Sequence, residues 1–330
     1  MKAWFDFIAD QNNQADLQQS QVVCDLPDFS LLFVGGDDAA DFLQNQLSND
    51  IRQTTSELSQ FSSLSTAKGR MIATFRVVAI DGGYILFLPS SNLATLQQKL
   101  QTAVLRSKVV IADISDSFSR FSITIDETMA EPLEQLPQQV DQVYQSDSLI
   151  IVNIPAAQSR KRFLFLGNNA DESIKLWNQL SASLVVNSSS HWRLQDIEAG
   201  IPNIYPETSE TFVLQMANLQ LINGVSFKKG CYPGQEVVAR IQYLGRLKRR
   251  MYLASLASST TPVPGNEMRS SDSEKADGSG KVVDAVQLTE NRVVFLFIAQ
   301  IEKADHHDLV LDKQPDTKIE LGSLPYSIET

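Results

Sequence analysis

The densest group of chemically useful residues lies at positions 228–236, which read Lys-Lys-Gly-Cys-Tyr-Pro-Gly-Gln-Glu. Two glycines and a proline within five positions favour a tight turn, because glycine reaches positive φ and proline fixes its own φ. The turn presents the thiol of Cys231 on a bend. Apolar residues then recur at helical spacing as far as Gly245, which predicts a short helix directly after the turn.

The surroundings of Cys231 leave two interpretations open. A cysteine that precedes a helix and has Lys228 and Lys229 beside it lies in a setting that favours the nucleophilic thiolate. Free cysteines are, however, often buried and inert. The sequence predicts Cys231 as a candidate catalytic thiol with Lys229 as a candidate assisting cation, and an inert buried cysteine is the alternative.

Cations are concentrated after this turn. Residues 228–250 hold seven lysines and arginines and one carboxylate, Glu236, whereas the whole chain has a formal net charge of −11. That net charge argues against a general nucleic-acid-binding protein, whose affinity comes mainly from neutralising phosphates. A basic segment on an acidic body predicts one anion-attracting face, and a merely solvated surface is the alternative. The candidate patch residues are Arg240, Arg246, Lys248, Arg249 and Arg250.

Length and composition limit the class of protein. A chain of 330 residues predicts two or three domains. Two distant cysteines exclude a disulfide scaffold, and His191, His306 and His307 show no metal-ligand spacing, so we predict no metal site. The first residues lack a signal-peptide pattern and no apolar run could span a bilayer, so we expect a cytoplasmic protein without membrane contact.

Paired strands alternate with single helices over the first two thirds of the chain, which is typical of an α+β fold. The start of the chain and residues 126–147 have no clear periodicity, and residues 202–227 form a long loop of the kind that is often functional. Strands are predicted at 22–24, 30–34, 61–65, 71–80, 84–88, 109–114, 121–125, 149–154 and 162–166, and helices at 39–47, 93–104, 171–180 and 188–198.

The pattern changes after Arg250. Short β-rich runs separated by turn residues follow one another, which predicts a small β-barrel as a separate C-terminal domain. These runs lie at 251–256, 280–288, 292–301, 308–312 and 318–321.

The segment from Lys229 to Glu236 resembles the signature K-G-C-Y-x-G-Q-E of the YgfZ family of folate-binding, tRNA-modifying proteins. Its motif positions are Lys229, Gly230, Cys231, Tyr232, Gly234, Gln235 and Glu236. Further matches at residues 43–50, 67–70, 198–202 and 324–327 extend the resemblance over essentially the whole chain.

Members of this family are similar to the aminomethyltransferase, or T-protein, of the glycine cleavage system. The resemblance implies a three-domain cloverleaf in which two ferredoxin-like α+β units and a C-terminal β-barrel surround a central channel for tetrahydrofolate. On this basis the first domain comprises residues 1–115 with 188–245, the second 116–187, and the barrel 246–330.

The resemblance also implies three folate-binding residues. Trp192 matches a family tryptophan associated with folate, and Phe29 stands where the family has a second one. An aromatic face can pack against the pterin or aminobenzoyl ring, although phenylalanine lacks the indole N–H. Glu198 matches a T-protein glutamate that meets the pterin, whose N–H groups a carboxylate can accept. The alternatives are a core tryptophan and a surface glutamate.

One mismatch concerns the aminomethyl transfer itself. Where the T-protein has an aspartate that serves the transfer, this chain resembles it around Lys68 to Thr74 but has Ala73. Alanine can neither hold a proton nor orient an amine, so glycine-cleavage activity is not expected.

The resemblance thus implies a folate-binding protein required for the modification of some tRNAs. In this hypothesis it supports the synthesis or repair of iron–sulfur enzymes such as methylthiotransferases, with the Cys231 thiol near bound tetrahydrofolate. Two alternatives remain: a folate-dependent one-carbon transferase, and a non-catalytic scaffold that binds an assembly factor or tRNA through residues 240–250.

Overall fold

The computed structural model describes residues 1–11, 16–157, 159–306 and 308–328, so His307 lies outside the described residues. The described chain divides into two compact units. Unit 1 comprises Met1–Gln44, Asp50–Gln60 and Phe75–Trp192, and unit 2 comprises Asn45–Asn49, Phe61–Thr74 and Arg193–Thr330. None of the helices in the described ranges is long and apolar enough to cross a membrane.

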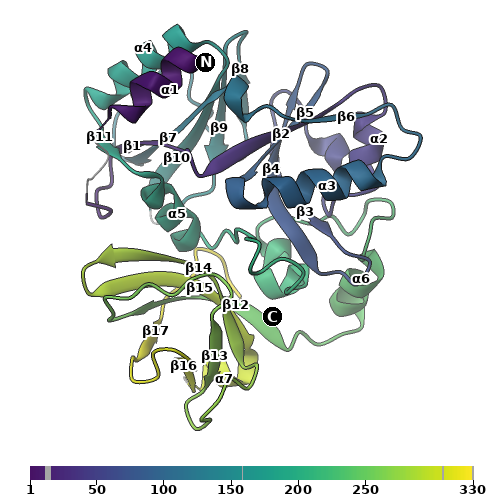
Figure 1. Ribbon diagram of the computed structural model, residues 1–330, viewed down its shortest axis with the longest axis vertical. Helices are drawn as coiled ribbons and strands as arrows, with labels where there is room; N and C mark the ends of the chain where they lie inside the picture. Colours follow the sequence, from purple (N-terminus) through teal and green to yellow (C-terminus); the bar gives the residue numbers. More distant parts are fainter. Residues whose placement is uncertain (12–15, 158, 307, 329–330) are drawn as a thin grey trace. The chain divides into compact units, whose positions relative to one another are not determined.

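A six-stranded sheet forms the core of unit 1, in the order β11-β1-β7-β10-β9-β8. Only the β1–β11 pair is parallel. Helices α1 (Lys2–Ala9) and α4 (Ala170–Ser181) pack together against it (Figure 1) and bury Trp4 and Trp177 beside Phe121. The strands are β1 (Val22–Asp25), β7 (Ser119–Asp126), β8 (Val143–Gln145), β9 (Leu149–Ile154), β10 (Arg160–Gly167) and β11 (Val185–Asn187).

A second sheet has five strands in the order β3-β4-β5-β2-β6. Its strands are β2 (Phe29–Gly35), β3 (Gln60–Ser65), β4 (Met71–Ile80), β5 (Gly83–Pro89) and β6 (Val110–Asp113). Helix α2 (Ala39–Gln44) follows β2, and α3 (Leu93–Ala103) follows β5 and contacts β2 and β6. The hairpin turn between β4 and β5 lies at the predicted glycines, since Gly82 has a φ of +76°.

A curled antiparallel sheet forms the C-terminal part of unit 2, in the order β16-β13-β14-β15-β12-β17, and resembles half of a barrel (Figure 1). Its buried face carries Phe295 and Phe297. The strands are β12 (Arg249–Leu256), β13 (Glu267–Ser270), β14 (Gly280–Thr289), β15 (Arg292–Gln300), β16 (Leu309–Leu311) and β17 (Ile319–Leu321). The helices that lie in this unit are α6 (Gln235–Tyr243) and α7 (Ile301–Asp305), and α5 (Ser189–Glu198) spans the division between the units.

These elements confirm the predicted α+β class and the β-rich C-terminal region. The expectation of an irregular start was wrong, because Trp4 and Ile8 lie one helical turn apart and bury the inner face of α1. Strands β8, β11 and β13 were missed, since three or four residues are too few for a clear alternation. The long loop contains short 3-10 helices at Leu214–Ala217 and Leu219–Leu221. The three-domain boundaries stay a prediction.

Candidate functional site

Cys231 lies on a tight turn that leads into α6, as the glycines and the proline predicted. Its side chain is exposed. Gly234 precedes the helix with a φ of +83°, and a Cβ at this position would lie 2.5 Å from the Cα of Gly69 and 2.6 Å from the oxygen of Thr66. Only glycine fits such a contact in a left-handed conformation. The turn is therefore fixed against residues 66–69 while its thiol faces outward.

Lys229 anchors the same turn to a second segment of unit 2. Its side chain is only 7% exposed, and its Nζ donates to the carbonyl oxygens of Leu47 at 2.6 Å and Asn49 at 2.9 Å. The Nζ also lies 5.1 Å from the centre of the Tyr232 ring. Carbonyl dipoles and an aromatic face can stabilise a buried ammonium group. This geometry favours an anchoring role, and the predicted catalytic role of Lys229 stays a prediction.

Residues 45–49 form the receiving segment for this anchor. Ser48 Oγ donates to the Gly224 carbonyl at 2.8 Å, and Asn49 Nδ2 donates to the Asn223 carbonyl at 2.7 Å. The amide of Ser226 in turn donates to the Ser48 carbonyl at 3.0 Å. The end of the long loop is thus bonded to the same segment as Lys229. Sequence patterns gave no sign of these residues as supports, because their partners are about 175 positions away.

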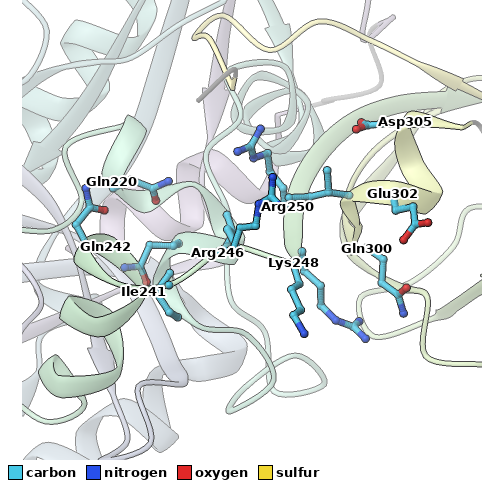
Figure 2. A pocket seen from close by; sticks show the side chains of 14 residues that line it. Gln220, Ile241, Gln242, Arg246, Lys248, Arg250, Gln300, Glu302 and Asp305 are labelled. Carbon is cyan, nitrogen blue, oxygen red and sulfur yellow. The ribbon is translucent and has the colours of Figure 1, made fainter.

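A groove of about 1280 Å³ lies in unit 2 at the other end of α6 (Figure 2). Of the five predicted patch residues, four line it, and the fifth, Arg240, is exposed on α6. The lining residues are Gln215, Gln220, Ile241, Gln242, Gly245, Arg246, Leu247, Lys248, Arg249, Arg250, Gln300, Ile301, Glu302 and Asp305.

The cations of the groove differ in how they are engaged. Arg250 donates a hydrogen bond to the carbonyl of Ile328 and is half-buried. Arg246, Lys248 and Arg249 make no ion pair with any residue that the structure describes. Three charged groups of one sign therefore remain available to an anionic ligand.

Two carboxylates, Glu302 and Asp305, lie on the α7 side of the groove (Figure 2). Burial raises the pKa of the neighbouring Tyr252 to about 12, and the negative charge of Asp305 adds to this rise. These carboxylates would repel phosphate or carboxylate ligands on that side. The anion-attracting part of the groove is therefore the segment from Arg246 to Arg249.

Helix α6 connects the thiol turn to this groove. Nine residues span about 13 Å at the usual helical rise. Gln215 Nε2 donates to the Val238 carbonyl at 2.6 Å and ties the helix to a neighbouring 3-10 helix. Gln215 is a supporting residue that the sequence patterns did not reveal. The Cys231 turn and the basic groove thus lie at opposite ends of α6.

The two predicted folate-contacting aromatic residues lie together in unit 1. Phe29 is stacked on Phe87 with ring centres 4.8 Å apart, and the Trp192 ring meets both edge-on, at 6.0 Å from Phe29 and 5.8 Å from Phe87. The guanidinium of Arg162 lies 4.3 Å from the centre of the Trp192 ring. Phe29 is 2% and Trp192 3% exposed. Their own packing therefore closes most of this cluster, and Phe87 and Arg162 are members that sequence reasoning missed.

Glu198 is half-buried at the end of α5 and accepts a hydrogen bond from Gln195 Nε2 at 3.1 Å. Gln195 Oε1 is buried and has no hydrogen-bond partner among the described residues. A carboxylate and an amide oxygen are acceptors that suit the N–H groups of a pterin. The indole N–H of Trp192 also has no partner there, but Trp4 and Trp177 share this property, so it does not single out Trp192. The acceptors on α5 fit folate better than the closed aromatic cluster does.

Ala73, which stands where the resemblance implies an aspartate in the T-protein, is fully buried in β4 and carries only a methyl group. The hydroxyl of the next residue, Thr74, donates to the Pro202 carbonyl at 2.8 Å and accepts from the Ile204 amide at 3.1 Å. This hydroxyl supports the backbone of the long loop. Neither residue offers a group that could exchange a proton with a substrate.

The fold is similar to that of an aminomethyltransferase. The crystal structure of glycine cleavage system aminomethyltransferase T from Bartonella henselae is similar over 94% of this chain and 87% of that one, with a TM-score of 0.67 and 12% sequence identity. At this identity the similarity shows the fold alone. No protein-family model matches the chain.

Full-length relatives define the family more narrowly. The tRNA-modifying protein YgfZ of Pectobacterium carotovorum subsp. carotovorum (strain PC1) is 30% identical over 97% of this chain and 96% of its own length. Its counterpart from Yersinia enterocolitica is 29% identical, over 92% of each chain, and that from Pectobacterium atrosepticum is 29% identical, over 95% of this chain and 94% of its own. The chain belongs to the YgfZ family.

Proposed function

We propose that this protein binds folate and is required for the modification of some tRNAs, and that it supports the synthesis or repair of iron–sulfur enzymes through the thiol of Cys231. The observation that carries the proposal is the exposed Cys231 on a turn that Lys229 and Gly234 fix in place. The name of the relatives, tRNA-modifying protein, supports the link to tRNA.

The two cysteines of the chain differ in the way this role requires. Cys24 is buried in β1, and its burial raises the pKa of the thiol to about 12, so it stays protonated and inert. Cys231 is exposed and lies four residues before the start of α6, with exposed Lys228 three residues upstream in the sequence. A thiol in that position can reach a metal centre or a disulfide of another protein, which suits the maintenance of iron–sulfur enzymes.

In this proposal Glu198 of unit 2 contacts folate, and Trp192 and Phe29 of unit 1 are the aromatic residues that the resemblance implies for it. The carboxylate of Glu198 would accept hydrogen bonds from the N–H groups of the pterin. The outer edge of the Trp192 and Phe29 cluster would pack against the rings of folate. Bound tetrahydrofolate supplies a one-carbon carrier and a reduced pterin. The basic patch at residues 240–250 would attract an anionic ligand. This role fits the cytoplasmic location that the sequence predicts.

A non-catalytic scaffold that binds tRNA directly is the second candidate, and the basic groove is the observation that favours it. A one-carbon transferase receives less support, because Ala73 and Thr74 offer no proton-handling group.

Two measurements test the main proposal. In a strain that lacks the gene, the wild-type chain should restore the modified nucleosides that mass spectrometry of bulk tRNA detects; no restoration at normal expression would contradict the tRNA role. Calorimetry should show tetrahydrofolate binding to the wild type and weaker binding to E198Q. The control E172Q changes an exposed glutamate of α4, and absence of heat with all three proteins would remove folate from the proposal.

A further inference from the structure

We propose that the groove between α6 and β12 binds an unpaired segment of tRNA. In this inference Arg246, Lys248 and Arg249 contact phosphates, and the ring of Tyr243 stacks on a base. The choice of tRNA among RNAs rests on the proposed function, and the choice of an unpaired segment rests on the groove itself.

Three cations of the groove are available to an anionic ligand. Arg246 and Lys248 are exposed, and neither they nor Arg249 make an ion pair within the described part of the chain. All three lie within residues 246–249, where an irregular segment leads into the first residue of β12, and they line one groove (Figure 2). Consecutive cations in an extended segment can follow successive phosphates of a strand, and nucleic-acid affinity comes largely from such contacts.

An exposed aromatic side chain lies three residues before Arg246 in the sequence. Tyr243, at the end of α6, is 67% exposed, and its ring centre lies 6.3 Å from that of Phe227 in an edge-on arrangement. Leu244, the next residue, is 87% exposed. Core packing does not explain two large apolar side chains in solvent. Aromatic rings beside cations form the stacking platforms that single-stranded nucleic acids use.

The groove is large and is lined by several polar side chains. Its volume of about 1280 Å³ exceeds the roughly 300–1,000 Å³ of a typical small-molecule site, so an extended ligand fits better than a compact one. The amides of Gln220, Gln242 and Gln300 lie along it and can bond to base edges (Figure 2). Bases offer both donors and acceptors to these amides and a stacking face to Tyr243, which favours RNA over an acidic peptide.

The carboxylates Glu302 and Asp305 on the opposite side restrict how a strand can lie. Phosphates would avoid that side, so the backbone should follow residues 246–249 while the bases face Tyr243 and the amides of Gln220 and Gln242. A rigid duplex carries phosphates on all sides and would meet both carboxylates. The groove therefore discriminates in favour of unpaired RNA.

The test uses fluorescence anisotropy with the full chain and two labelled probes that carry equal numbers of phosphates. One probe is a synthetic tRNA anticodon stem-loop, and the other is a fully paired RNA duplex. The stem-loop should bind more tightly than the duplex. In R246A/K248A its affinity should fall about tenfold at ~100 mM salt, and the slope of log K against log salt should fall by about 1.4. Y243A should lower the affinity for the stem-loop by about tenfold, and Y243F should leave this affinity unchanged.

The control variant K275A/K313A removes two exposed lysines of the same unit outside the groove and should bind like the wild type. Unfolding curves of the variants should coincide with that of the control. Equal losses in R246A/K248A and the control, tighter binding of the duplex, or displacement of the stem-loop by an equimolar glutamate peptide would each overturn the inference. None of these results touches the complementation and folate measurements, so the two proposals fail separately.

Discussion

Gly234 and Gly69 approach each other so closely that a Cβ on Gly234 would lie 2.5 Å from the Cα of Gly69. This contact places the turn that carries Cys231 directly on the turn before β4. It follows that the position of the thiol depends on a backbone contact between two segments about 165 residues apart in the sequence.

Replacing Gly234 by alanine should therefore destabilise the protein. The Cβ of the alanine would clash with Gly69, and the residue would have to adopt a left-handed conformation. Together these effects should lower the free energy of unfolding by at least about 1–2 kcal/mol. Urea unfolding of G234A should show a lower free energy than that of G230A, because a Cβ on Gly230 would meet nothing within 4 Å. Equal stability of the two variants would contradict the close contact.

Lys229 should prove to be a structural residue when compared with its neighbour. K229M removes the ammonium that bonds the carbonyls of Leu47 and Asn49, and buried groups left without partners cost about 1–3 kcal/mol each. K228M changes an exposed lysine and should leave unfolding unaffected. If the K229M protein were as stable as the wild type but did not restore tRNA modification in a deletion strain, Lys229 would be catalytic instead.

Trp192 should contribute strongly to the stability of unit 1. W192A removes the ring that packs on Phe29, Phe87 and Arg162, and such truncations typically cost about 3–5 kcal/mol. W192F keeps much of this packing and should lose far less. If both variants fold but bind folate more weakly than the wild type, the indole of Trp192 also contacts the ligand. A W192A protein as stable as the wild type would contradict the closed aromatic cluster.

Acid stability should depend on two buried groups of unit 1 in opposite ways. Burial lowers the pKa of His191 to about 4, so its neutral form stabilises the folded state above pH 6.5, and this stabilisation is lost as pH falls towards 4. Burial raises the pKa of Asp25 to about 6, so the folded state holds a proton more tightly, and stability falls as pH rises from about 4 to 6. Each group contributes at most about 3 kcal/mol.

Between pH 6.5 and 4, H191Q should therefore lose less stability than the wild type, and D25N should lose more. Thermal unfolding at steps of half a pH unit measures both effects. H306Q replaces an exposed histidine and serves as the control. Parallel pH curves for all four proteins would show that neither buried group is linked to folding.

Local sequence patterns predicted most of the elements, although they missed α1 and the short strands β8, β11 and β13, and they did not reveal contacts between distant residues. The alternation of β4 and the turn around Cys231 are encoded by residues close in sequence, which is why both were found. The bonds from Lys229 to residues 47 and 49 join positions about 180 apart, and no periodicity marks such a pair. Arg162 over Trp192 and the burial of Phe29 likewise depend on strands that meet only in the folded chain.

We expect this protein to act through the exposed thiol of Cys231. The most direct test measures modified nucleosides by mass spectrometry of tRNA from a deletion strain that expresses C231A, C231S or C24A at wild-type levels. Both Cys231 variants should fail to restore modification while they retain tetrahydrofolate binding, and C24A should restore it. Full restoration by C231A would contradict the claim.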